Sequence, residues 1–113
     1  MAIKYYPIPE KRQVVAVMSN TQYDAYNKID KMMRETGFCF TPNGHNECKK
    51  YMMPDAFKVT LTCDERDVYD IEEGKKFAKK KLMRNYRKSL NKRIAAFKET
   101  FDKFVVAVNA KID

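Results

Sequence analysis

Strict alternation of apolar and polar residues marks one strand between residues 57 and 63. The apolar positions are Phe57, Val59, Leu61 and Cys63, and the polar positions between them are Lys58, Thr60 and Thr62. Because successive side chains of a strand point to opposite faces, this pattern predicts a strand with one buried face. On that face Cys63 would behave as a small hydrophobic residue.

A second strand is predicted from Arg12 to Met18, where valines make the apolar run nearly continuous. Such a run is typical of a strand that is buried on both faces, so we expect it at the centre of the sheet. Pro7 and Pro9 interrupt the residues before it and predict an extended entry segment there.

The residues after this strand predict a short helix. The N-cap candidates are Ser19, Asn20 and Thr21, and Gly37 is placed to end the helix as its C′ residue. The apolar face contains Tyr26, Ile29 and Met33, flanked by Ala25 and Met32. Residues 38–41 are a candidate short strand that joins the sheet, and the segment from there to Asp55 predicts a long loop.

The last third of the chain predicts one long helix. Asp70 is placed to cap its start, and no proline follows Asp55. A helix from about residue 71 to about residue 110 would extend about 60 Å, which is longer than a domain of this size is wide. Part of it must therefore protrude or pair with another helix.

An apolar stripe runs along this helix and changes its spacing. Its members are Ala78, Leu82, Tyr86, Leu90, Ile94, Phe97, Phe101, Phe104 and Val108. Up to Leu90 the steps are four residues, so the stripe winds around the helix; beyond Leu90 they alternate between four and three, as in a coiled-coil seam. The residues predicted to mediate self-association are Phe97, Phe101, Phe104 and Val108, and we expect a homodimer.

Together these elements predict an α+β fold in which a small antiparallel or mixed sheet carries one short helix and one long basic helix. A chain of 113 residues suits a single domain over residues 1–113. The run from Val14 to Met18 is too short to span a membrane, and the first residues lack the apolar core of a signal peptide. Three cysteines, an odd number, favour reduced thiols. We therefore expect a cytoplasmic protein with no membrane partner.

Positive charge is concentrated in one segment. The net charge is +8, and ten Lys and Arg residues without any Asp or Glu fall between Lys75 and Arg93. Such a face attracts phosphate or an acidic protein surface more strongly than dispersed charge does. The cations that fall opposite the apolar stripe are Lys76, Lys80, Lys81, Arg84, Arg87, Lys88 and Lys92. These are the candidate nucleic-acid-binding residues, and the alternative is a solvated outer helix face without a ligand. Tyr86 lies among them, but its place on the stripe favours a core role over stacking on a base.

Metal and catalytic chemistry have little support. A Cys3His zinc site would use Cys39, His45, Cys48 and Cys63, but no tight Cys-x-x-Cys knuckle is present, so we expect no metal and no cofactor. One His without an identifiable partner Asp, and no Gly-rich phosphate loop, predict a protein that is not an enzyme. The carboxylates expected to form turns and helix caps, in preference to binding a divalent cation, are Asp64, Glu65, Asp67 and Asp70.

Residues 10–17 and 63–78 are the two segments of this chain that resemble segments of other proteins. A strand leads through Cys63, an acidic turn, the pair Tyr69-Asp70 and a Gly-Lys-Lys step at residues 74–76 into a basic helix. This arrangement resembles a group of short uncharacterised proteins of phages and mobile elements in Firmicutes. The resemblance implies a phage or prophage origin and no particular activity. That group joins its two strands by a short turn, whereas here residues 20–56 intervene and either decorate a hairpin or create a β-α-β-β-α unit.

Two functions remain open at this point. The first is a non-enzymatic accessory protein that binds nucleic acid or a host ribonucleoprotein through the basic helix face. The second is a small inhibitor of a host defence protein, similar to anti-CRISPR proteins, that acts by protein–protein binding. Phosphate binding weakens steeply with salt, whereas an apolar protein interface does not, so salt dependence distinguishes the two.

Overall fold

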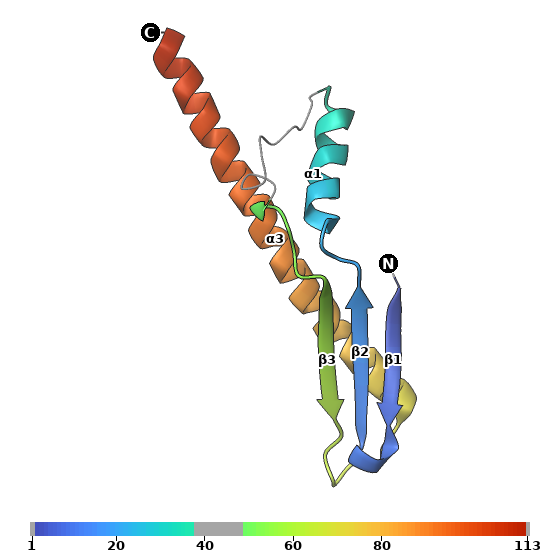
Figure 1. The fold of residues 1–113 in the computed structure, drawn as a ribbon. Coiled ribbons are helices and arrows are strands. Elements are labelled where there is room, and N and C mark those ends of the chain that lie inside the picture. Colours follow the sequence, from blue (N-terminus) through green and yellow to red (C-terminus); the bar gives the residue numbers. More distant parts are fainter. Residues whose placement is uncertain (1, 38–48, 113) are drawn as a thin grey trace. The chain divides into compact units, whose positions relative to one another are not determined.

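The computed structural model describes residues 2–37 and 49–112. Its elements are β1 (Ile3–Ile8), the short 3-10 helix η1 (Pro9–Lys11), β2 (Gln13–Ser19), α1 (Asp24–Glu35), β3 (Ala56–Thr62) and α3 (Ile71–Ile112) (Figure 1). A three-stranded antiparallel sheet with one short and one long helix is an α+β fold, which confirms the predicted class. None of the helices within the described residues has the length and apolar character needed to cross a bilayer.

Contacts within the chain group into two compact units. The first unit contains Met1–Thr21 and Pro54–Lys88, and therefore the sheet and the first part of α3. The second contains Gln22–Met53 and Ser89–Asp113, and therefore α1 and the rest of α3. The single domain expected from the chain length stays a prediction.

β2 is the central strand of the sheet, as its apolar run predicted, and the strand order is β1-β2-β3. β2 and β3 pair as antiparallel neighbours, from Gln13 opposite Thr62 to Ser19 opposite Ala56. The strands before and after the insert are therefore antiparallel neighbours, and α1 lies within the insert. The strand predicted near residues 38–41 lies outside the described residues.

β1 is a strand that the sequence interpretation did not predict. It pairs with β2 from Ile3 opposite Met18 to Ile8 opposite Gln13. A proline removes a backbone donor, but Pro7 is tolerated because β1 is an edge strand. The chain turns into β2 through η1, where the N–H of Arg12 (φ 53°) donates to the carbonyl of Pro9 at 3.0 Å.

One face of the sheet carries the core of the first unit. The register places Val14, Ala16 and Met18 of β2 on the same face as Val59 of β3, and all four are at most 4% exposed. In Figure 1 the strands lie in front of α3, whose buried side packs on this face. The residues of α3 that fill the interface are Ala78, Leu82 and Tyr86, and the Tyr86 ring meets Phe57 edge-on at 5.8 Å.

The predicted helix caps are correct at the start of α3 and at the end of α1, but not at the start of α1. Asp70 caps α3, because its Oδ1 accepts the N–H groups of Glu72 (3.0 Å) and Glu73 (3.3 Å). Gly37 follows α1 with φ 85°, which confirms its C′ role. The N-cap predicted among residues 19–21 is wrong, because α1 begins at Asp24 after Tyr23, without a side-chain cap.

Thr21 has a different role, which explains that error. Its side chain is fully buried, its hydroxyl donates to the carbonyl of Pro54 at 2.5 Å, and its N–H donates to the carbonyl of Asp55 at 3.2 Å. Thr21 therefore ties the exit of β2 to the entry of β3. Ser19 is still part of β2, and Asn20 makes the turn with φ 61°.

The second unit has a small core of its own. Among its described residues, the buried ones are Ala25, Ile29, Tyr51, Met53 and Leu90. Arg93 donates from Nε to the carbonyl of Met52 (3.1 Å) and from Nη1 to Ser89 Oγ (2.9 Å). The segment before Pro54, interpreted from the sequence as a loop, therefore supplies core residues. On α1 the predicted apolar face holds at Ala25 and Ile29, but Met32 is 57% exposed.

Candidate nucleic-acid interface

A row of cations runs along the part of α3 that belongs to the first unit. Lys76, Lys80, Arg84 and Lys88 are spaced by four residues and are all exposed. We call these four the basic row. Neighbours in it are about 6 Å apart along the helix axis.

The basic row is fixed in place by a buried row with the same spacing. Ala78, Leu82 and Tyr86 are 0%, 0% and 6% exposed, and each follows a cation of the basic row by two residues. Two residues correspond to about 200° around a helix, so the two rows lie on opposite sides of α3. Because both rows wind at the same rate, packing of the buried row on the sheet holds the basic row in water.

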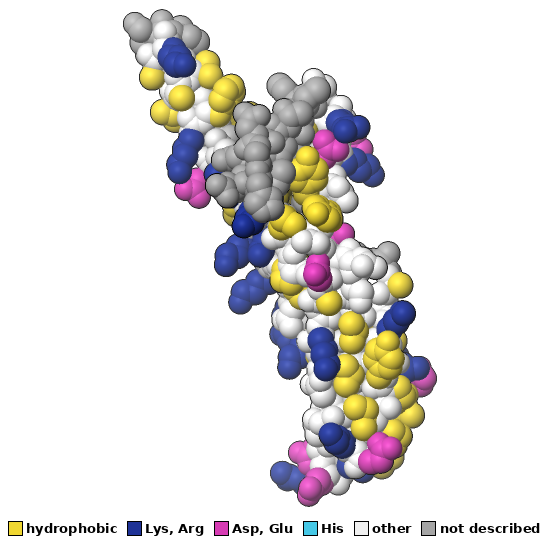
Figure 2. Space-filling model, in the orientation of Figure 1, with side chains coloured by type: hydrophobic (Ala, Val, Ile, Leu, Met, Phe, Trp, Pro, Cys, Tyr) yellow, Lys and Arg dark blue, Asp and Glu magenta, His cyan; other side chains and the backbone are white. Residues whose placement is uncertain are grey.

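The remaining predicted cations flank or extend the basic row. Lys81 and Arg87 are exposed on either side of it. Lys92 is exposed one step further along α3, in the second unit. Figure 2 shows dark blue side chains in a line along the edge where α3 passes β3, without magenta side chains among them.

Acidic side chains neutralise only the start of this surface. Nζ of Lys75 lies 3.6 Å from Oε1 of Glu72, and Nζ of Lys76 lies 3.8 Å from Oε1 of Glu73. Among the described residues, no acidic partner is paired with Lys80, Arg84, Arg87 or Lys88. Like charges four residues apart destabilise a helix by about 0.2 to 0.5 kcal/mol per pair, so a bound anion would relieve this repulsion.

Tyr86 is a core residue, as its position on the stripe predicted. It is 6% exposed and packs edge-on against Phe57. It offers no ring face to a base.

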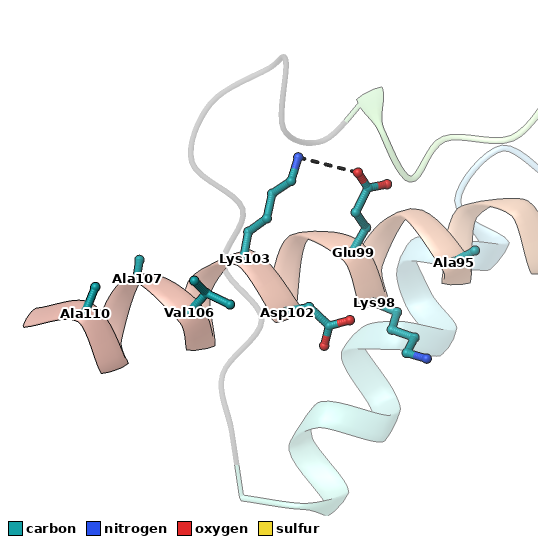
Figure 3. A pocket seen from close by; sticks show the side chains of 8 residues that line it. All are labelled: Ala95, Lys98, Glu99, Asp102, Lys103, Val106, Ala107 and Ala110. Atoms are coloured by element: carbon teal, nitrogen blue, oxygen red, sulfur yellow. Dashed lines mark ion pairs between the residues drawn. The ribbon is translucent and has the colours of Figure 1, made fainter.

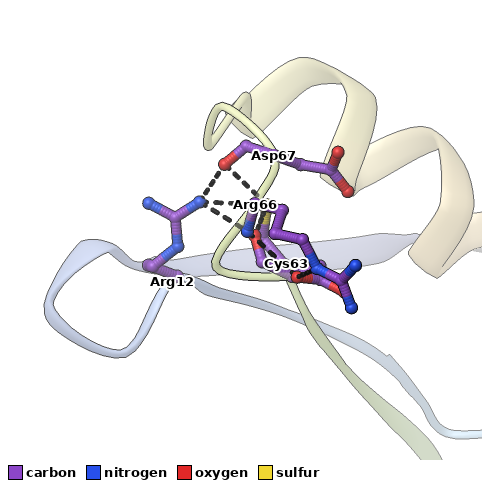
Figure 4. Close-up of polar contacts among 5 residues, drawn as sticks. Arg12, Cys63, Arg66 and Asp67 are labelled. Carbon is purple, nitrogen blue, oxygen red and sulfur yellow. Dashed lines mark hydrogen bonds and ion pairs between the residues drawn. The ribbon is translucent and has the colours of Figure 1, made fainter.

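The acidic turn after β3 is organised by Arg12 (Figure 4). Arg12 Nη2 donates to the carbonyl oxygens of Asp64 (3.1 Å) and Asp67, and lies 3.5 Å from Cys63 Sγ. Asp64 Oδ1 accepts the N–H of Arg66 at 3.0 Å, which is the geometry of a side-chain-stabilised turn. The carboxylates of Asp64 and Asp70 thus have the turn and capping roles predicted for them.

Cys63 does not lie on the buried face of a strand. β3 ends at Thr62, and the Cys63 thiol lies among Arg12 and the carbonyl oxygens of Asp64 (3.5 Å) and Val68 (3.8 Å). No metal-binding cluster of three or more His, Cys, Asp or Glu residues occurs in the described part of the chain. The other members of the zinc set, Cys39, His45 and Cys48, lie outside that part.

A pocket of about 730 Å³ lies between this turn, the end of β3 and the start of α3. Four carboxylates line it, from Asp64, Asp67, Asp70 and Glu73, against one cation, Arg12. Because Arg12 already donates to the turn carbonyls and the carboxylates repel phosphate, this pocket does not suit an anion.

The predicted self-association residues divide into two groups. Phe97 is partly covered, with its ring 6.2 Å from Tyr51 and stacked on Phe101 at 6.3 Å. Phe101, Phe104 and Val108 are 44%, 63% and 38% exposed.

The opposite side of this helical segment becomes apolar as well (Figure 3). It carries charged residues up to Lys103, which pairs with Glu99 at 3.4 Å. Beyond them it carries Val106, Ala107 and Ala110. The sequence stripe described only one side, so this apolar end of α3, residues 104–110, is more extensive than predicted.

Comparisons with protein-family models, with curated proteins and with solved structures found no match to this chain.

Proposed function

We propose that this chain is a non-enzymatic accessory protein of a phage or mobile element that binds nucleic acid, free or in a ribonucleoprotein, through the basic row of α3. The observation that carries the proposal is the exposed row of cations held opposite a buried row of the same spacing. A helix surface that only needs to be soluble usually carries both signs of charge. From Lys80 to Lys88 this one carries only cations.

Recognition on this surface depends on charge and shape. Lysine and arginine side chains neutralise phosphates, and each neutralised phosphate releases condensed counterions. Phosphate contacts position a protein on nucleic acid but carry no base sequence information. The proposed activity is therefore tight binding at low salt with little sequence preference.

The test replaces with Gln three members of the basic row, Lys80, Arg84 and Lys88, and the flanking Arg87; we call this the basic-row variant. The buried row is untouched, so the variant should fold and should bind unrelated sequences more weakly than the parent. If four phosphates are contacted, the slope of log affinity against log salt should fall in magnitude by about 3 to 4 for duplex DNA. Fluorescence anisotropy with labelled duplexes over a salt series measures both quantities.

A matched control removes the same charge elsewhere. Lys11, Lys28, Lys31 and Lys98 are exposed and lie off the basic row. Replacing these four lysines with Gln should change the affinity for DNA, and the slope of log affinity against log salt, only slightly. Equal losses in the two quadruple variants would mean that net charge, and not the basic row, attracts the ligand. No binding of the parent to DNA or RNA at low salt would reject the proposal.

A second function is favoured by a separate observation, the apolar end of α3. Phe104 and Val106 are 63% and 67% exposed, and exposed patches of this kind mark protein interfaces. In this alternative the chain is a small inhibitor of a host defence protein. Its binding would change little with salt, in contrast to phosphate binding.

A further inference from the structure

The sheet has a second face, which α3 does not cover. The register places on it Lys4, Tyr6 and Ile8 of β1, Gln13, Val15 and Val17 of β2, and Lys58, Thr60 and Thr62 of β3. We call this the open sheet face. Figure 2 views the molecule from this side and shows hydrophobic side chains over β1 and β2 with single Lys or Arg side chains beside them.

The two charged strand positions of the open sheet face are both lysines. Lys4 and Lys58 are both paired in register with Val17, one from each edge strand. They are exposed, they make no ion pair with a described residue, and two strand spacings place their backbones about 10 Å apart. None of the strand positions on this face is acidic. The face is thus complementary to an anion and not to a cation.

Tyr6 supplies an aromatic ring to the open sheet face. In the register of the sheet it lies between the level of Lys4 and Lys58 and the level of Gln13 and Thr62. Tyr6 is the cross-strand neighbour of Val15 and is 50% exposed, whereas Val15 is 8% exposed. Gln13 and Thr62, one register pair further along the sheet, are hydrogen-bonded at 3.2 Å, and Thr60 is exposed opposite Val15. An aromatic side chain flanked by cations and amide or hydroxyl groups suits a nucleotide, because the ring stacks on the base while the cations neutralise phosphates.

We propose that the open sheet face binds single-stranded nucleic acid, with a base stacked on Tyr6 and the backbone phosphates near Lys4 and Lys58. A duplex does not fit this role, since its paired bases already stack on one another. A second copy of the chain does not fit either, because packing two such faces together would bring four lysines together without an acidic partner.

This site is distinct from the basic row. α3 packs on the other face of the sheet, and the basic row lies on the side of α3 that points away from it. The inference therefore goes beyond the proposed function and does not rest on it, and the two surfaces respond to different substitutions.

The experiment measures anisotropy of labelled oligothymidylate and of a duplex of equal length against the parent, four variants and the basic-row variant of α3 described above. Tyr6→Leu keeps an apolar neighbour for Val15 but removes the ring. Its affinity for oligothymidylate should fall at least about fivefold, since stacking of a base on an aromatic side chain contributes about 1 to 3 kcal/mol. Tyr6→Phe keeps the ring and should bind as the parent does. Tyr23→Leu, at another exposed tyrosine outside the sheet, should also bind normally.

The fourth variant combines Lys4→Gln with Lys58→Gln. For a single strand, this variant should reduce the magnitude of the slope of log affinity against log salt by about 1.4. Ultraviolet irradiation of the parent with oligothymidylate should cross-link Tyr6, and peptide mass spectrometry identifies the attachment site without any substitution. Circular dichroism confirms that each variant is folded.

The opposite results overturn the inference. Equal affinity of Tyr6→Leu and the parent, or cross-links only to residues outside the sheet, would show that the open sheet face is not the site. Loss of single-strand binding in the basic-row variant, with none in the sheet variants, would assign all binding to α3. A loss of single-strand binding confined to the sheet variants would support this inference, and binding of the duplex to the basic-row variant tests the basic row separately.

Discussion

Gly74 sets how closely α3 approaches the sheet. A Cβ atom at this position would lie 2.6 Å from Cγ2 of Val14, which is buried in the central strand. Valine is stiff about χ1, so Val14 cannot easily turn away. The residue at position 74 therefore has to lack a side chain for the first turn of α3 to pack on β2.

Replacement of Gly74 by Ala should destabilise the protein, although alanine is the better helix former. The helix gains up to about 1 kcal/mol from the substitution, but overpacking against Val14 costs about 1 to 3 kcal/mol. We expect the free energy of unfolding in urea to fall by about 1 kcal/mol. In the double variant Gly74→Ala with Val14→Ala the clash is absent, so the loss should be smaller than the sum of the two single losses. Additive losses would show that the two residues are not in steric conflict.

Cys63 is poorly placed to hold a metal, because the guanidinium of Arg12 lies 3.5 Å from its sulfur and repels a cation. We expect elemental analysis of protein purified without chelator to find no stoichiometric zinc. About one zinc per chain that is lost in Cys48→Ser would contradict this expectation.

At the scale of elements, the strongest sequence patterns were the most predictive. Alternation identified β3 and continuous valines identified the central strand, because burial on one or two faces leaves a direct trace in the sequence. β1 was missed because Pro7 normally argues against a strand and edge pairing leaves no comparable trace. The missing strand also hid the open sheet face, since Lys4 and Tyr6 share a surface with Lys58 only through β1.

The exposed cations and the buried residues of α3 could both be predicted, because helical periodicity assigns them to opposite sides of the helix. A helical wheel separates Leu82 from Arg84 without any tertiary information. The pairing of Lys76 with Glu73 was not predicted, because Glu73 lies just before the segment from Lys75 to Arg93 that contains no acidic residue. The role of Thr21 could not be predicted either, since its partners Pro54 and Asp55 are distant in sequence.

The apolar end of α3 is exposed, and we predict that the chain self-associates through it. Phe104 is the phenylalanine of that segment and is 63% exposed, and burying such a side chain contributes about 1.5 to 3 kcal/mol. Phe104→Asp should therefore raise the dimer dissociation constant at least about tenfold in sedimentation equilibrium. Asn91→Asp makes the same one-unit change of charge at an exposed position of the same helix and should change the dissociation constant much less. A parent that stays monomeric at high micromolar concentration would rule this interface out.

At the scale of the whole molecule, charge and hydrophobicity are segregated along α3. The first unit presents the basic row, whereas the second presents the apolar end. The proposed phosphate binding and the predicted self-association would therefore use different parts of one helix. Raising the salt concentration should weaken the first and leave the second in place.

The late position of α3 in the chain has a consequence for biosynthesis. Val14, Ala16 and Met18 are translated before the residues that cover them, Ala78 to Tyr86, which come about sixty residues later. At ribosomal speeds the interval from Met18 to Leu82 is about 3 to 13 s, whereas a hairpin forms in microseconds. For those seconds the nascent chain presents an uncovered apolar strand that other nascent chains or chaperones can bind. A chain cut off before Ala78 lacks the residues of α3 that close the core of the first unit, so its apolar strand would stay uncovered.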